Sequence, residues 1–216
     1  MRPPIRLASI MKLPVTYVFT HDSIYVGEDG PTHQPVEHLA SLRIIPGMTV
    51  LRPGDPEETN EAWRLAVEKG DGPVALALTR QNLAVYAKAD KNWKANFKKG
   101  AYIVKDVDGI PDVVLVATGS EVNLALEAAE KSGKKVKIVS MPSRETFVKQ
   151  DAAFRKQILN EGVKTVVAEV GVVDGWEGIA TDRDHVLCMD SFGESGPAKD
   201  VATHFGFTAE RLAQLL

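Results

Sequence analysis

The sequence has very little cysteine: Cys188 is the one cysteine among 216 residues. A single cysteine excludes an internal disulfide and any zinc site that needs several thiolates. Cys188 lies in the apolar run "DHVLCMD", and a thiol in such a run is more often a buried strand residue than a nucleophile. This cysteine usage is typical of a cytoplasmic protein.

Long apolar runs and an excess of positive charge are missing as well. No run approaches the roughly 20 apolar residues that span a bilayer. The start, "MRPPIRLASI", lacks the apolar core of a signal peptide. The formal net charge of −3 provides no overall field to attract nucleic acid or an anionic membrane. We therefore expect a cytoplasmic protein without a membrane or nucleic-acid partner.

The chain has the composition of an ordinary globular protein, with 44% hydrophobic and 25% charged residues. Strand-like and helix-like segments alternate, which predicts an α/β fold of two domains with mostly parallel sheets flanked by helices. Strands are predicted at 15–20, 48–52, 74–79, 112–117, 136–140, 164–168 and 185–189. Helices are predicted at 34–43, 55–70, 118–133, 144–162 and 208–216.

The helix at 55–70 has the clearest start and end signals. Asp55 is a favourable N-cap, Pro56 suits the first helical position, and Glu58 completes a capping box. Its apolar stripe is predicted to consist of Ala62, Trp63, Ala66 and Val67.

Residues 87–106 interrupt the alternation with six lysines and no clear period. We interpret this stretch as an exposed connection, with Trp93 and Phe97 as anchoring aromatics rather than a stacking platform for nucleic acid. The predicted division is a first domain at 1–86, a linker at 87–109 and a second domain at 110–216.

Polar side chains follow two of the predicted strands. His21 comes directly after the strand at 15–20, and Arg80 after the strand at 74–79. Ligands of parallel sheets bind beyond the carboxyl ends of the strands, where a His and an Arg can clamp an anion. The structural alternative is that His21 only hydrogen-bonds the turn and that Arg80 pairs with Asp22.

The segment "GEDGPTH" at 27–33 is rich in conformational controls and titratable groups. Gly27 and Gly30 allow positive φ, so Asp29 and His33 are held on a shaped loop. A carboxylate and an imidazole held together suit proton transfer or hydrogen bonds to substrate hydroxyls. A metal site that adds His21 is the competing hypothesis, but zinc-binding helix spacing is absent. An Asx-type turn followed by a helix cap is the purely structural alternative.

Two further motifs favour structural roles. "TGSE" at 118–121 opens a predicted helix, where free backbone N–H groups can attract an anion. The glycines of a nucleotide loop are absent, so we predict Ser120 as a simple helix cap. Asp190 and Glu194 flank a glycine-rich turn in "DSFGESGP", which favours a loop over a catalytic pair.

Taken together, these residues resemble the transketolase family. The stretch "THDSIYVGEDGPTHQPVEHLASLRIIPGMTVLRPGD" is similar to its most distinctive active-site motif. "DGPVALALTRQNL", "VATGSEV", "VSMPS" and "FGESGPAKDVATHFGFT" resemble the family in the same order, over essentially the whole chain. The resemblance implies an incomplete thiamine-diphosphate pyrimidine-binding domain followed by a transketolase C-terminal-like domain.

The resemblance also implies roles for individual residues. The family transfers a two-carbon ketol unit between sugar phosphates, using thiamine diphosphate and a divalent metal, Mg or Ca. His21 and Arg80 are expected to hold the sugar's phosphate, and Asp29 to contact a substrate hydroxyl. His33 is expected to lie beside the cofactor's reactive centre, to contact the transferred fragment and to assist proton movement.

Parts of the family pattern are not found in this chain. The diphosphate-binding domain and the first half of the pyrimidine-binding domain, with its activating glutamate, are expected to be missing as a truncation. "GDG" at 70–72 with Asn96 matches the spacing of the family's metal motif, but it follows a helix instead of a strand, so we reject it. We therefore expect this chain alone to be inactive, without cofactor or metal, and to require the missing N-terminal region.

The truncation should leave a sheet edge exposed in the first domain, which we expect to be less stable than the second or to be covered by a neighbouring chain. The family relationship favours a homodimer. Alternative functions are a deoxyxylulose-phosphate or dihydroxyacetone synthase, or a non-catalytic dimerisation or binding module. The paired histidines around Asp29, with Arg80, favour sugar phosphates over 2-oxo acids.

Overall fold

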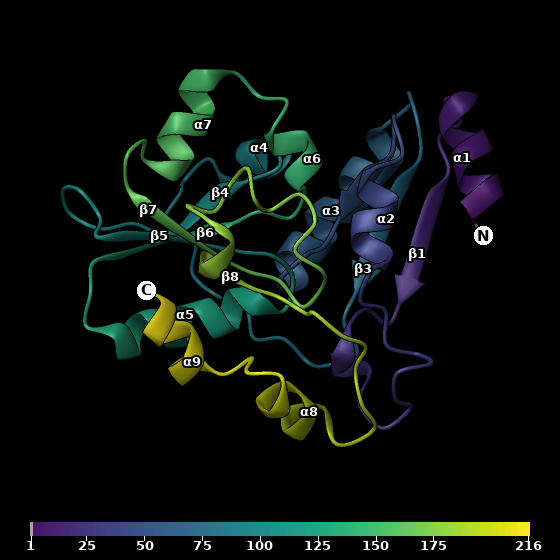
Figure 1. Ribbon diagram of the computed structural model, residues 1–216. Coiled ribbons are helices and arrows are strands. Elements are labelled where there is room, and N and C mark those ends of the chain that lie inside the picture. The colour runs from purple at the N-terminus through teal and green to yellow at the C-terminus, as the bar shows by residue number, and fades with distance from the viewer. Residues whose placement is uncertain (1) are drawn as a thin grey trace.

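The computed structural model describes residues 2–216 and contains two sheets (Figure 1). The first sheet has the order β1-β3-β2 and is parallel; its strands are β1 (Thr16–Thr20), β2 (Thr49–Leu51) and β3 (Val74–Leu78). The second has the order β4-β6-β5-β7-β8. Its strands are β4 (Tyr102–Lys105), β5 (Val113–Ala117), β6 (Val136–Ser140), β7 (Lys164–Ala168) and β8 (Val186–Leu187). Only β4 is antiparallel to its neighbour, so the predicted two-domain α/β fold is confirmed.

Helices α1 (Arg2–Ile10) and α2 (His38–Arg43) cover one face of the first sheet. We had not predicted α1, and α2 begins at residue 38 instead of 34. The late start has a tertiary cause, because the Val36 carbonyl accepts a hydrogen bond from Val172 N at 3.2 Å. In a helix starting at 34 that carbonyl would bond within the helix instead.

Helix α3 (Pro56–Glu68) begins as predicted, since Asp55 Oδ1 accepts from Glu58 N at 2.8 Å. The Glu58 side chain reaches back to Gly54 N at 2.7 Å, one residue before the N-cap. The predicted apolar stripe is wrong in part. Trp63 and Val67 are 41% and 78% exposed, because α3 turns Glu58 inward, where it accepts hydrogen bonds from the second domain.

The remaining helices are α4 (Trp93–Phe97), α5 (Glu121–Ser132), α6 (Arg144–Phe147), α7 (Ala152–Leu159), α8 (Ala198–His204) and α9 (Ala209–Leu215). Two short 3-10 turns, η1 (Ile24–Val26) and η2 (Arg183–His185), complete the elements. These helices lie around the second sheet (Figure 1), except α8, which contacts η1 of the first domain. Figure 1 shows α5 and α9 side by side below the sheet, and α7 lies on its other side.

Two expectations for this part of the chain need correction. The stretch at 87–106 is not a plain connection, because it contains α4 and β4, and β4 pairs with β6. Phe97 is buried and the Trp93 ring lies 5.5 Å from the Tyr102 ring, so these aromatics are anchors. The helix predicted at 144–162 is broken between α6 and α7, where Asp151 caps α7. The exact domain boundaries stay a prediction.

The two domains share a hydrophobic core. One continuous cluster contains Leu51 and Leu76 from the first sheet and Leu115 and Val166 from the second. Smaller clusters lie under α1 and α2 and behind the second sheet. Each domain therefore depends on the other for part of its apolar burial.

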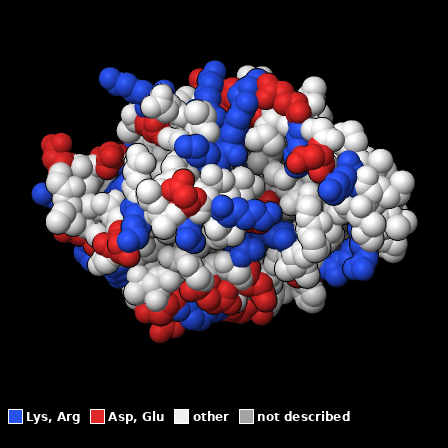
Figure 2. All heavy atoms as spheres, turned by 90° about the horizontal axis from the view of Figure 1, so that it is seen from above, with Lys and Arg blue, Asp and Glu red and all other residues white. Residues whose placement is uncertain are grey.

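The surface is mixed in charge. On the face drawn in Figure 2, lysines and arginines are interspersed with acidic residues, without a continuous field of one sign. None of the described helices is long and apolar enough to cross a membrane. Exposed apolar side chains gather instead near edge strand β1, where Leu7, Ile10, Met11 and Val18 are all exposed. The expected exposed edge of the first sheet thus lies at β1.

A buried ion pair joins the domains behind α2. Arg43 donates to both carboxylate oxygens of Glu169, each at 2.7 Å, and Trp176 Nε1 donates to Glu169 Oε2 at 2.6 Å. Burial alone would raise the pKa of Glu169, but Arg43 outweighs it and holds this pKa below its ordinary value. The Glu169 carboxylate is therefore ionised at neutral pH.

We expect Glu169→Gln to lower the free energy of unfolding by about 3–5 kcal/mol at pH 7, since the buried Arg43 then keeps only the more distant Glu145 carboxylate, at 3.8 Å. Because the folded-state pKa of Glu169 is depressed, its contribution is present above the ordinary pKa of 4.5 and is lost as the pH falls. The difference between wild type and variant in urea denaturation should thus shrink on acidification. Glu161→Gln, at an exposed ion pair with Lys156, is the control and should change little. A difference independent of pH would contradict this assignment.

Candidate active site

The structure places His21 and Arg80 at one edge of the first sheet, as predicted. Strands β1 and β3 are parallel neighbours, and Thr20 pairs with Leu78, so both chains leave the sheet at the same end. Both side chains are exposed. The Arg80 guanidinium donates to Val26 O at 2.8 Å, so the alternative in which it pairs with Asp22 is wrong.

His21 lines a cavity of about 360 Å³ at this end of the sheet, between α1 and α2. Its lining is largely apolar and includes Phe19 and Leu39, together with the polar side chains of Glu37 and His38. Such a concave, largely apolar site with a few polar groups is the usual form of a small-molecule pocket.

The loop at 27–33 has the predicted backbone. Gly27 and Gly30 adopt φ values of 85° and 76°, which L-amino acids with side chains rarely do. Gly30 N donates to Gly27 O at 3.1 Å, and His33 N to Gly30 O at 3.0 Å, so two successive turns shape the loop. Asp29 and His33 are both exposed on it. His33 Nδ1 contacts Thr32 Oγ1 at 2.9 Å, while Nε2 has no hydrogen-bond partner among the described residues.

Gln34 holds this loop in place, and sequence reasoning missed it. This buried side chain donates through Nε2 to Gly27 O at 2.8 Å and to Glu194 O at 2.9 Å. It thereby ties the loop to the "DSFGESGP" segment, which is a loop as predicted. A side chain added at Gly30 would overlap Ser195 Oγ of the same segment. Nothing in the local pattern marks Gln34, because its second partner is 160 residues away.

Behind His21, the neighbouring Asp22 is buried and bonded to Arg52. Arg52 Nε donates to Asp22 Oδ2 at 2.5 Å, and the other end of the guanidinium pairs with Glu121. Ser120 occupies the N-cap position of α5 (Glu121–Ser132), as predicted, but its side chain makes no capping hydrogen bond. Its hydroxyl instead accepts from Arg52 Nη2 at 3.1 Å and donates to Glu121 Oε1 at 2.6 Å.

The residues proposed as metal ligands by sequence do not form a cluster. Among residues 2–216, no group of three His, Cys, Asp or Glu side chains is placed to hold a metal ion. The "GDG" at 70–72 lies between the end of α3 and β3, and Asp71 pairs with Lys69 Nζ at 2.5 Å. Asn96 instead donates to Asp90 Oδ2 at 2.7 Å.

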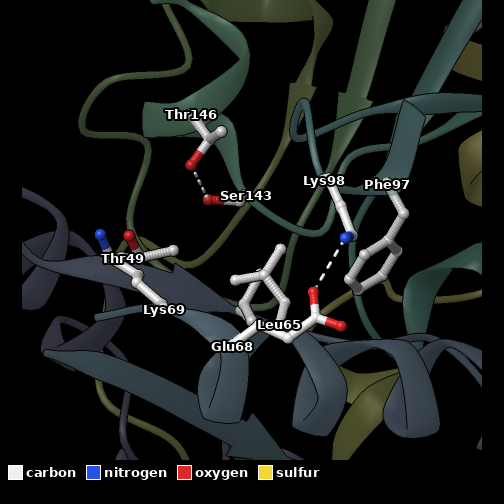
Figure 3. A pocket seen from close by; sticks show the side chains of 9 residues that line it. Thr49, Leu65, Glu68, Lys69, Phe97, Lys98, Ser143 and Thr146 are labelled. Atoms are coloured by element: carbon white, nitrogen blue, oxygen red, sulfur yellow. Dashed lines mark hydrogen bonds and ion pairs between the residues drawn. The ribbon is translucent and has the colours of Figure 1, made fainter. Parts of the chain in front are cut away.

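Two other features carry no site. Cys188 lies half-buried just after β8, and burial raises the pKa of its thiol to about 11, which disfavours a nucleophile. A pocket of about 290 Å³ lies between the domains. Figure 3 shows its lining, where Lys98 pairs with Glu68 and Ser143 contacts Thr146. Its other lysine, Lys69, pairs with Asp71, so both cations are already neutralised.

Comparison with known proteins agrees with this architecture. Residues 1–85 match the pyrimidine-binding domain of transketolase, and residues 100–208 match the transketolase-like C-terminal domain. The chain belongs to the transketolase family.

Individual relatives cover the whole chain. A transketolase from Treponema pallidum is 47% identical over 216 residues, all of this chain and 32% of the relative. The Leishmania mexicana transketolase structure is 40% identical, with a TM-score of 0.90 over 98% of this chain and 31% of the other. A Pichia stipitis transketolase variant in complex with fructose-6-phosphate is 38% identical, with a TM-score of 0.90 over 99% and 31%. The chain thus spans about a third of the length of these relatives.

The contact between Gly30 and Ser195 generates a test of loop docking. We expect Gly30→Ala to destabilise the protein by about 2–4 kcal/mol, through backbone strain plus overlap with the Ser195 hydroxyl. Gly109→Ala is the matched control: Gly109 has a φ of 80° but open space around it, so strain alone should cost about 1 kcal/mol. Urea denaturation of both variants measures the difference.

Adding Ser195→Gly to Gly30→Ala should recover most of the excess loss, since it removes the overlapping atoms. Equal losses for Gly30→Ala and Gly109→Ala would show that the loop does not depend on this contact.

Proposed function

We propose that this chain is the sugar-phosphate-recognising part of a transketolase, an enzyme that transfers a two-carbon ketol unit between sugar phosphates. The observation that carries this proposal is the placement of His21 and Arg80 at the carboxyl edge of adjacent parallel strands. Ligands of parallel sheets bind at this edge. The glycine-shaped loop with Asp29 and His33 follows the same strand as His21.

In this proposal His21 and Arg80 hold the phosphate. The Arg80 guanidinium offers a planar fork of donors that matches phosphate oxygens, and its bond to Val26 O leaves further N–H groups for the ligand. The Pichia stipitis structure, a complex with fructose-6-phosphate, supports a phosphorylated sugar as the substrate class.

Asp29 and His33 recognise the hydroxyl groups of the sugar. An exposed carboxylate accepts hydrogen bonds from hydroxyls, which suits Asp29 for reading one of them. The Nε2 atom of His33, which is not engaged by Thr32, contacts a hydroxyl of the transferred fragment and takes or returns its proton. The firm loop beneath both residues reduces the entropy lost on binding.

We propose that thiamine diphosphate, with Mg or Ca, supplies the carbanion chemistry of the whole enzyme. The described residues do not fit a metal site, because they form no cluster of suitable ligands and Asp71 is paired with Lys69. The proposed holder is therefore a region of the relatives that precedes the part matched here. The whole enzyme is further proposed to be a cytoplasmic homodimer.

A binding experiment tests the recognition of phosphate. Titration of the chain with fructose 6-phosphate, followed by NMR, should show binding that unphosphorylated fructose does not match. We expect Arg80→Gln to weaken binding by roughly 10- to 100-fold, the range for losing a charge-assisted hydrogen bond. Arg155→Gln, at an exposed position on α7, should leave the affinity unchanged. Equal affinities for fructose and its phosphate would contradict the proposal.

A second experiment tests whether this chain can catalyse ketol transfer by itself. We expect the chain alone to show no ketol transfer, even with thiamine diphosphate and Mg²⁺ added, because its described residues form no site for the metal. A coupled assay with pure protein measures this. Turnover above the buffer rate would show that the chain holds the cofactor by itself.

A further inference from the structure

The "TGSE" turn at 118–121 has a role that neither a helix cap nor an anion site describes. It belongs to the second domain, yet it encloses the side chain of Arg52, which directly follows β2 of the first. Arg52 is fully buried, and its carbonyl accepts from Gly119 N at 3.1 Å. Gly119 has a φ of 60°, and a Cβ there would lie 2.7 Å from Arg52 Cγ. Only glycine therefore fits this close approach.

The far end of the Arg52 guanidinium is held entirely by this turn. Its Nη groups donate to Thr118 O at 2.6 Å, to Ser120 Oγ at 3.1 Å and to the Glu121 carboxylate. Glu121 is itself fixed, because it also accepts from Val170 N at 2.9 Å. The guanidinium thus has a defined position set by the second domain.

The near end of Arg52 determines the path of the chain after His21. Arg52 Nε donates to Asp22 Oδ2, and Asp22 N donates to Leu78 O at 2.9 Å, next to the last paired residues of β1 and β3. The following Ser23 donates to Asp22 Oδ1 at 3.3 Å and has a φ of 60°, which a non-glycine residue adopts only when held there.

The turn at Ser23 also positions Arg80. Ser23 Oγ accepts from Tyr25 N at 3.4 Å and so starts η1. The carbonyl of Val26, at the end of η1, receives Arg80 Nη1 at 2.8 Å. A shift of Asp22 would therefore move both His21 and the anchor of Arg80.

We propose that Glu121 is a positioning residue, which sets the sugar-phosphate site through Arg52 and Asp22 from the other domain. The predicted effect of Glu121 on sugar-phosphate affinity rests on the proposed function. Asp22 accepts only the Nε–H group of Arg52, and the Nη groups need other acceptors. The Glu121 carboxylate is one of these acceptors, and it holds the guanidinium in the buried position where Nε meets Asp22. The C-terminal domain thereby acts on substrate binding without touching the substrate.

The test is Glu121→Gln, with Glu127→Gln, exposed on the same helix α5, as the matched control. A glutamine has one acceptor oxygen for donors from Arg52, Ser120 and Val170, and its NH₂ group would face other donors. The first readout is the ring resonance of His21, identified among the five histidines by its loss in His21→Gln. The second readout is the affinity for fructose 6-phosphate.

We expect the His21 resonance to shift in Glu121→Gln while those of His185 and His204 stay in place, and the affinity to fall by about fivefold or more. Glu127→Gln should change neither readout. A purely structural role would lower the melting temperature but leave the His21 resonance of the folded protein unchanged, and that result would overturn the proposal. If Glu121→Gln does not fold, the milder Ser120→Ala takes its place, and an unshifted His21 there also overturns it.

The two proposals can fail separately. If the wild type does not bind fructose 6-phosphate, the proposed function fails, but the His21 resonance still decides whether Glu121 positions this turn.

Discussion

The buried guanidinium of Arg52 is the interaction on which the rest of the structure depends. It lies between Asp22 of the first domain and Glu121 of the second, with no exposure to solvent. Burying such charges is costly unless every donor and acceptor is matched, and removing one partner of a buried pair typically costs about 3–5 kcal/mol. The additional bonds to Thr118 O and Ser120 Oγ complete the match, so the contact is stable only when both domains are in place.

Two other buried polar groups also join the domains along the interface. Arg43 of α2 forms a forked pair with Glu169 beyond β7. Glu58 of α3 accepts from Tyr102 and Ser140 of the second sheet, each at 2.6 Å. With the shared hydrophobic core, these contacts make the two domains one unit. Directional bonds between buried groups also restrict how the domains can sit together, which apolar packing alone does less well.

This construction explains how an open site can be well ordered. The four residues proposed to recognise substrate, His21, Asp29, His33 and Arg80, all come from the first domain and are all exposed. The groups that hold their backbone, such as Asp22 and Gln34, are buried and bonded to the second domain directly or through Arg52. Exposed side chains remain free to meet a ligand, while the loops that carry them are fixed from behind.

The sequence by itself determined the alternation of strands and helices, the carboxyl ends of β1 and β3 to within one residue, the positive φ of Gly27 and Gly30, and the Asp55 cap. All of these depend on local patterns, since strand and helix periodicity, glycine conformation and capping act over a few neighbouring residues. That His21 and Arg80 lie at the same edge of the sheet could also be predicted, because parallel strands end at the same edge.

Only the tertiary structure decided the partners of the buried charges. Asp22 meets Arg52 and not Arg80, the Ser120 hydroxyl bonds Arg52 instead of capping its helix, and Trp63 faces solvent because Glu58 is turned inward. The late start of α2 and the pairing of β4 with β6 have the same origin. Each depends on a group that is tens of residues away in the chain, and local periodicity contains no information about which distant group will fill a buried position.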